Sequence, residues 1–64
     1  MGIKISMAAA RINAGLTQKE VCKKLNISKT TIVNYEKGRT VPDIITGQKF
    51  ADLYEIPIDN LKFF

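Results

Sequence analysis

Three polar side chains within residues 29–34 have hydrogen-bonding groups that match the edges of nucleic-acid bases. The ammonium of Lys29 can donate to guanine, the amide of Asn34 can pair with adenine through two bonds, and Thr30 offers a hydroxyl and a methyl group. Val33 lies among them and would suit either a thymine methyl or the following loop. An ordinary solvated face would have the same composition. The elements that position these residues therefore decide between base contact and solvation.

Residues 18–35 predict two short helices joined by a tight turn. Thr17 and Glu20 fit a capping box at the start of the first helix. Asn26 tolerates positive φ and can make the turn, and Ser28 can cap the second helix. This is the layout of a helix-turn-helix, whose second helix can lie in the major groove of DNA.

Further helices are expected over residues 6–14, 43–54 and 58–63, with Ser6 and Asp43 as caps. No segment is typical of a strand, and a β-sheet would contradict the prediction. Eight apolar residues share the inward phase of these helices and should be largely buried: Ile12, Leu16, Val21, Leu25, Ile32, Phe50, Leu53 and Leu61. The sequence thus predicts one all-α domain over residues 1–64, with five helices in a compact arrangement.

The net charge of +4 is unevenly distributed along the 64 residues. Residues 18–39 carry six basic and two acidic side chains, whereas residues 40–64 carry two basic and four acidic ones. A basic surface with an acidic opposite side suits a polyanionic partner, although a lysine-covered solvated surface is the alternative.

Several classes of protein are not expected. The chain has no histidine, one cysteine that should be buried, and no carboxylate pair in an evident cleft, so we expect no enzyme. We also expect no metal site, no cofactor and no small-molecule ligand. No apolar run is long enough to span a membrane, residues 1–10 lack signal-peptide organisation, and a lone Cys22 suits a reducing compartment. These features favour a cytoplasmic protein.

Two segments make the predicted helix-turn-helix pattern more specific. They are Gly15-Leu16-Thr17-Gln18, and Tyr35-Glu36 followed after one residue by Gly38-Arg39. Other residues at matching positions are Arg11, Val21, Leu25, Ile32, Pro42, Ala51 and Leu61. With these residues the chain resembles the Cro/repressor-type helix-turn-helix family, which has the five-helix, lambda-repressor-like fold. It differs where the family commonly has Ala, Gly, Leu and Gly: at Cys22, Asn26, Gly47 and Glu55.

The resemblance implies a sequence-specific regulator of transcription that binds double-stranded DNA, of the phage or small bacterial repressor type. The expected base contacts are Lys29, Thr30, Val33 and Asn34, and the expected phosphate contacts are Thr17, Gln18, Lys37 and Arg39. The alternatives are a solvated helix start for Gln18, and favourable contact with a helix dipole for Lys37 and Arg39. The resemblance also implies that Arg11 and Glu36 form a structural ion pair.

A single recognition helix covers few base pairs, so we expect a homodimer on a pseudo-palindromic operator. Phe63 and Phe64 are the candidates for the contact between copies. The alternative function is a protein-interaction module that retains the fold, such as an antirepressor or antitoxin-like partner.

Overall fold

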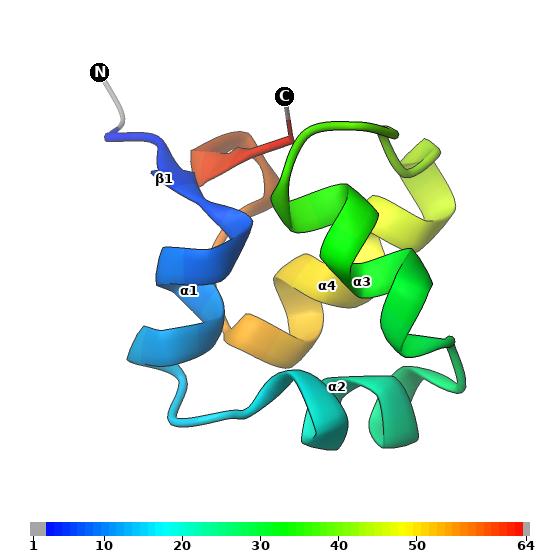
Figure 1. The fold of residues 1–64 in the computed structure, drawn as a ribbon. Coiled ribbons are helices and arrows are strands. Elements are labelled where there is room, and N and C mark those ends of the chain that lie inside the picture. The colour runs from blue at the N-terminus through cyan, green and yellow to red at the C-terminus, as the bar shows by residue number, and fades with distance from the viewer. Residues whose placement is uncertain (1–2, 64) are drawn as a thin grey trace.

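Four α-helices make up most of residues 3–63, which are the residues that the structure, a computed structural model, describes. In chain order the elements are β1 (Ile5–Ser6), α1 (Met7–Asn13), α2 (Gln18–Leu25), α3 (Lys29–Glu36), α4 (Ile44–Tyr54), the 3-10 turn η1 (Ile58–Asn60) and β2 (Leu61–Lys62). Figure 1 shows α1, α2 and α3 arranged around α4. The mostly helical domain that the sequence predicts is therefore present.

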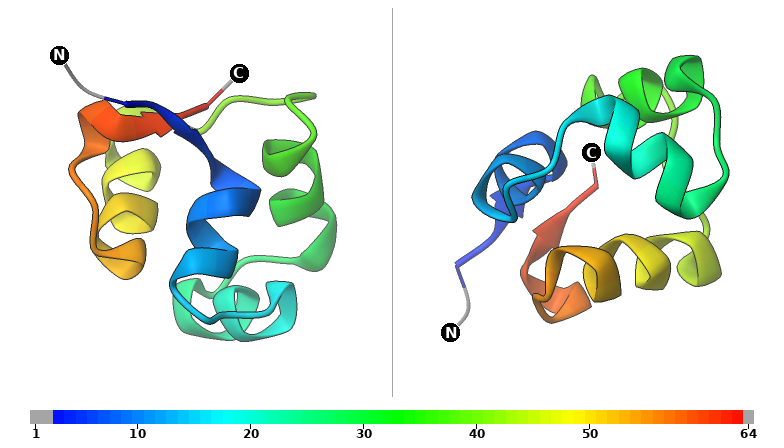
Figure 2. Two further views of the ribbon diagram at one scale, coloured as in Figure 1. Left: turned by 90° about the vertical axis from the view of Figure 1, so that its left-hand side faces the viewer. Right: turned by 90° about the horizontal axis from the view of Figure 1, so that it is seen from below.

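The predicted count of five helices is wrong, because the last segment forms only the single turn η1 before it becomes extended. Leu61 then pairs with Ile5 in a parallel two-stranded sheet, and Lys62 pairs with Ser6. Figure 2 shows both strands on the side of the molecule where the two chain ends lie. The expectation of no strand is also wrong, since two residues per strand are too few to show alternation in the sequence. The sheet contradicts the strict all-α prediction, but each strand has only two residues and the rest of the regular structure among the described residues is helical.

Local side-chain hydrogen bonds begin each helix. The four α-helices start at the predicted caps Ser6, Thr17, Ser28 and Asp43. At α2 the Thr17 hydroxyl accepts from the Glu20 amide at 3.1 Å, while the Glu20 carboxylate accepts from the Thr17 amide at 2.9 Å. This backbone hydrogen bond holds the pKa of Glu20 below its usual value, and the amide of Thr46 does the same for Asp43. The capping pattern in the sequence thus sets the helix starts.

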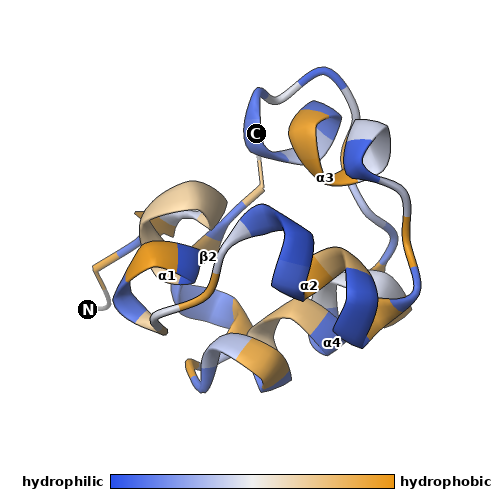
Figure 3. Ribbon diagram, turned by 60° about the horizontal axis from the view of Figure 1, so that its bottom comes forward, coloured by the Kyte–Doolittle hydropathy of each residue, from blue (hydrophilic) through white to orange (hydrophobic). Residues whose placement is uncertain are grey.

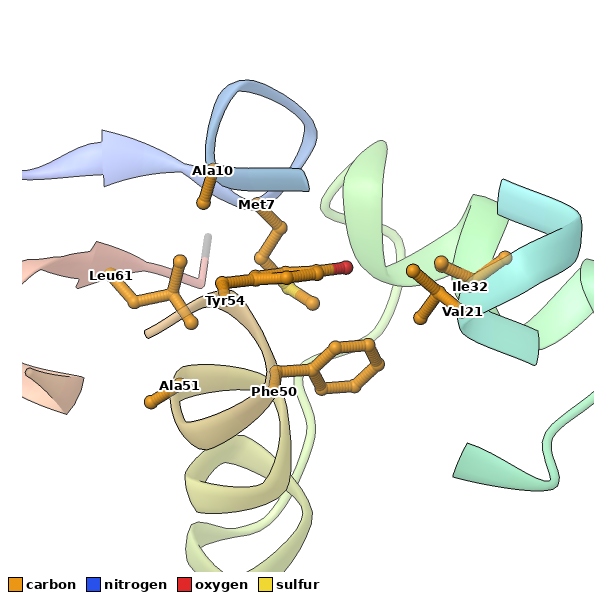
Figure 4. Packing of buried hydrophobic residues seen from close by; sticks show 8 residues of the cluster. All are labelled: Met7, Ala10, Val21, Ile32, Phe50, Ala51, Tyr54 and Leu61. Atoms are coloured by element: carbon orange, nitrogen blue, oxygen red, sulfur yellow. The ribbon is translucent and has the colours of Figure 1, made fainter. Parts of the chain in front are cut away.

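The core is formed by one side of each helix together with β2. Its buried hydrophobic residues are Met7, Ala10, Val21, Ile32, Phe50, Ala51, Tyr54 and Leu61. Figure 4 shows these side chains converging on the rings of Phe50 and Tyr54. The Tyr54 hydroxyl has no hydrogen-bond partner among the described residues, and its burial raises the pKa of Tyr54.

Four of the eight residues predicted to be buried are so: Val21, Ile32, Phe50 and Leu61. Leu16, Leu25 and Leu53 are only half-buried at the edge of this core. The prediction for Ile12 is wrong, because its side chain is 65% exposed. Met7 and Ala10 define the inner side of α1, and Ile12 lies about 200° around the helix from Ala10.

Packing explains the glycine at position 47 inside α4, for which the sequence showed no cause. A Cβ atom at this position would lie 3.1 Å from Cζ of Phe63, so the glycine allows the aromatic ring to approach α4. Phe63, which we expected at a contact between copies, therefore packs within its own chain. Phe64, the other candidate, lies outside the described residues.

Candidate nucleic-acid interface

The turn between α2 and α3 has the conformation that a helix-turn-helix requires. Asn26 has φ 56° and ψ 49°, which is the left-handed conformation predicted for it. The amide of the next residue, Ile27, donates to the Cys22 carbonyl at 3.0 Å, and the chain then enters α3 through the Ser28 cap. The turn lets α2 and α3 pack against each other while both keep a solvent-exposed side.

The four predicted base-contacting residues are not equally accessible on α3. Lys29 and Thr30 in the first turn are exposed, whereas Asn34 is half-buried. Val33 is also half-buried and packs against the core cluster. The beginning of α3 is therefore its most accessible part.

The charge at the beginning of α3 is positive, which is opposite in sign to the charge that a helix N-terminus favours. Helix N-termini favour acidic side chains because the macrodipole is positive there. The first turn of α3 contains no acidic residue and has Lys29 as its first residue. By contrast, the first turn of α2 contains Glu20. Positive charge thus adds to the positive end of the dipole at α3, which favours an anionic partner.

The exposed side of α2 adds further cations. Lys19, Lys23 and Lys24 are all exposed, and Figure 3 shows α2 largely in the blue of hydrophilic residues. All three lysines lie in the basic segment of residues 18–39 and were not among the predicted contacts. Their positive charges lie on the helix that packs against α3.

Glu36 connects three elements at the end of α3. Its carboxylate accepts from Nε of Arg11 at 2.8 Å and from Nε2 of Gln18 at 2.9 Å. Arg11 also donates to the Leu16 carbonyl at 3.0 Å, so α1 and the segment before α2 are joined to the same group. The Glu36 side chain is 7% exposed and that of Arg11 is 15% exposed. The ion pair that the resemblance implied is present, and Gln18 extends it.

This network brings the predicted phosphate-contacting residues into one region. Thr17 and Gln18 begin α2, and the Gln18–Glu36 bond holds them beside the end of α3, where Lys37 and Arg39 follow. Thr17, Lys37 and Arg39 are exposed, whereas Gln18 is half-buried. The pair Thr17 and Gln18 is far in the sequence from the pair Lys37 and Arg39, but the two pairs are neighbours in the fold.

The loop after α3 folds Arg39 back onto Asn34. Gly38 has φ 74°, a left-handed conformation that suits glycine. The backbone amide of Arg39 then donates to the Asn34 carbonyl at 2.9 Å, and its Nη1 lies 3.5 Å from Oδ1 of Asn34. A predicted phosphate contact and a predicted base contact therefore touch each other.

Comparison with known proteins agrees with this geometry. The helix-turn-helix family matches residues 7–61. The chain is 39% identical over 61 residues to the HTH-type transcriptional regulator ImmR of Bacillus subtilis, covering 95% of this chain and 48% of that protein. It is 37% identical over 51 residues to the cryptic phage CTXphi transcriptional repressor RstR of Vibrio cholerae, covering 80% and 46%. An uncharacterized HTH-type transcriptional regulator of Archaeoglobus fulgidus is 35% identical over 54 residues, covering 84% and 77%.

The chain belongs to the Cro/repressor-type helix-turn-helix family, whose members are DNA-binding transcription regulators and not enzymes. The resemblance drawn from the sequence is thereby confirmed. The chain spans about half the length of ImmR and RstR. Within residues 3–63, the α-helices are too short to cross a membrane.

Proposed function

We propose that this chain is a single DNA-binding domain over residues 1–64 that binds duplex DNA through α2 and α3 and represses transcription. The observation that carries the proposal is the exposed, positively charged beginning of α3, where Lys29 stands at the positive end of the helix dipole. This placement is locally unfavourable for the free protein. A partner that supplies negative charge would offset it, and DNA is such a partner.

In the proposed complex, the first turn of α3 enters the major groove. Lys29 and Thr30 contact base edges, and Asn34 contacts a base further along the same side of the helix. Asn34 must release or share Oδ1, which now lies 3.5 Å from Nη1 of Arg39, if it is to pair with adenine through two bonds. Val33 contributes less, since it packs against the core cluster.

Phosphate contacts at the beginning of α2 and just after the end of α3, which the Gln18–Glu36 bond brings together, hold α3 in place. Gln18 has a second amide hydrogen on Nε2 that Glu36 does not use, and this hydrogen can bind a phosphate oxygen. Thr17, Lys37 and Arg39 are exposed beside it, and the guanidinium of Arg39 suits a phosphate in a bidentate manner. These contacts set affinity and orientation, while the base contacts set sequence preference.

The proposed binding unit is a homodimer on a pseudo-palindromic operator. A lone small module buries modest area on DNA, and two copies would place their α3 helices about 34 Å apart. The name of RstR, a transcriptional repressor, supports repression as the outcome.

The experiment is a selection of bound duplexes from a random library, followed by binding of the selected and a scrambled duplex over a salt series. The selected duplex should bind more tightly, and both affinities should fall steeply with salt. Lys29→Ala with Thr30→Ala should reduce the preference for the selected duplex. Lys4→Ala is the charge-matched control, because Lys4 is exposed and precedes β1.

Repression is tested separately with a reporter gene that carries the selected site in its promoter. Expression should fall when the chain is present and recover with the Lys29→Ala and Thr30→Ala variant. If neither duplex binds at low salt, the protein-interaction alternative replaces this proposal.

A further inference from the structure

The backbone holds Arg39, just beyond the end of α3, beside Asn34. Gly38 has a left-handed conformation, which turns the chain back so that the Arg39 amide donates to the Asn34 carbonyl at 2.9 Å. The two side chains then meet, with Nη1 of Arg39 3.5 Å from Oδ1 of Asn34. The shorter backbone bond keeps the two residues neighbours, whatever the strength of the longer contact between their side chains.

The chemistry of the two groups decides which end of the Asn34 amide faces Arg39. A guanidinium has N–H donors and no acceptor, so only the amide oxygen can face it. Nδ2 of Asn34 makes no hydrogen bond among the described residues. Asn34 therefore has an oxygen that is engaged by its own chain and two N–H donors that are not.

An asparagine in this state suits guanine better than adenine. Pairing with adenine through two bonds requires the amide oxygen to accept from N6 while the amide nitrogen donates to N7. Guanine instead presents two acceptors in the major groove, N7 and O6, and needs only donors. The Nδ2 group of Asn34 can donate to these acceptors while Oδ1 stays with Arg39.

The guanidinium of Arg39 can keep this contact while it binds a phosphate. The bond to Asn34 uses one N–H on Nη1, and the other N–H donors of the guanidinium can bind phosphate oxygens. A phosphate that already fixes the guanidinium reduces the side-chain freedom that is lost when it also holds the amide. The long contact of 3.5 Å should therefore become stronger on DNA.

Lys37 resembles Arg39 in charge and place but not in this contact. It is exposed and follows α3 in the same loop, and it makes no bond to Oδ1 of Asn34 among the described residues. Replacing Lys37 removes one positive charge from the loop and leaves the Arg39–Asn34 contact in place. Lys37 therefore offers a matched control.

We infer that Arg39 is a positioning residue that determines the base preference of Asn34. By holding Oδ1 it leaves Asn34 with donors only and directs it to guanine. The inference rests on the proposed function and deepens it, and it replaces the expectation from the sequence that Asn34 pairs with adenine. Without Arg39 the amide can turn its oxygen to the base, and adenine becomes the better partner.

The test uses two duplexes that differ only at the base pair that Asn34 contacts. This pair is the position of the selected site at which Asn34→Ala loses its preference. The wild type and Lys37→Ala should bind the duplex with guanine there about tenfold more tightly than the duplex with adenine. Arg39→Ala should lose this factor or prefer adenine. The double variant Asn34→Ala with Arg39→Ala should bind both duplexes equally.

A salt series separates this effect from the loss of a charge. Lys37→Ala and Arg39→Ala should each reduce the salt slope by about one unit, because each removes one phosphate contact. Only Arg39→Ala should change the ratio of the two affinities. Comparison at low salt keeps the binding of both variants measurable.

A wild type that prefers any base other than guanine at this position would overturn the inference. So would a guanine preference that survives Arg39→Ala or disappears in Lys37→Ala. The same holds if Asn34→Ala changes the preference at no position of the selected site. Failure of the wild type to bind either duplex at low salt would instead overturn the proposed function.

Discussion

Nε2 of Gln18 donates a hydrogen bond to Oε1 of Glu36 across 2.9 Å, which joins the first residue of α2 to the last residue of α3. The same carboxylate pairs with Arg11, so it fixes the angle between the two helices of the candidate interface and ties both to α1. Only the nitrogen of the Gln18 amide can face Glu36, and this orientation leaves one N–H for a phosphate.

Loss of the Glu36 carboxylate should be strongly destabilising. Glu36→Ala leaves the largely buried Arg11 guanidinium unpaired, and we expect a loss of about 3 kcal/mol in the free energy of unfolding. Gln18→Ala removes one hydrogen bond to a charged group and should lose about 1.5 kcal/mol. Urea unfolding of both single variants and the double variant measures the coupling, which should be at least about 0.5 kcal/mol. Strictly additive losses would show that the Gln18–Glu36 bond contributes nothing.

Base and phosphate contacts should respond differently to substitution. Lys29→Ala or Asn34→Ala should weaken binding to the selected duplex by roughly 1–3 kcal/mol and relax preference at one base pair. Thr30→Ala should have a smaller effect, because a hydroxyl makes one bond. Arg39→Ala should weaken binding to the scrambled duplex as well as to the selected one and reduce the salt slope by about one unit. Identical behaviour of all four variants in a salt titration would contradict the assignment of base contacts.

Glu55 stores conformational strain at the end of α4. Its φ of 58° is left-handed, a conformation that costs a non-glycine residue about 1–2 kcal/mol. Glu55→Gly should therefore raise the free energy of unfolding by about 1 kcal/mol, after the greater freedom of glycine in the unfolded chain is counted. Asn26→Gly is the matched control, because Asn26 has the same conformation but tolerates it better. Thermal unfolding should show the larger gain for Glu55→Gly, and an equal or smaller gain would contradict the strain.

Gly47 and Phe63 should be energetically coupled. An alanine in a helix interior is favoured over glycine by about 1 kcal/mol, but here its Cβ would lie 3.1 Å from Cζ of Phe63. Gly47→Ala should thus gain little or destabilise in the wild type, and should gain up to about 1 kcal/mol when Phe63→Ala has removed the ring. Urea unfolding of the four proteins completes the cycle. The same gain in both backgrounds would mean that the ring moves freely away from α4.

Acid should weaken the starts of α2 and α4. Hydrogen bonds from Thr17 and Thr46 amides lower the pKa of Glu20 and Asp43 from their usual values of 4.5 and 3.8. A lowered pKa in the folded state means that the stabilisation is complete above the usual pKa and is lost as pH falls through the folded one. The unfolding temperature should therefore decrease below about pH 4.5. Glu20→Gln with Asp43→Asn should reduce this acid sensitivity while both caps persist. If the unfolding temperature of this variant depends on pH as that of the wild type does, the two carboxylates are not the cause.

The sequence by itself determined the features whose causes lie within a few residues. The capping box of Thr17 and Glu20 and the left-handed turn at Asn26 were predicted because the interacting groups are near neighbours in the chain. The same is true of the exposed Lys29 and Thr30, whose place on α3 follows from the cap at Ser28. The helix-turn-helix was predictable for this reason, since its shape is set by local hydrogen bonds and helical phase.

The tertiary structure alone decided the contacts between distant residues. The Gln18–Glu36 bond spans 18 residues, and the pairing of Ile5 with Leu61 joins the two ends of the described chain. Helical phase did not reveal that α1 would turn Ile12 to solvent, because several rotations of a short helix satisfy the same apolar pattern. These features depend on how the helices pack on one another, and only packing in three dimensions selects one arrangement.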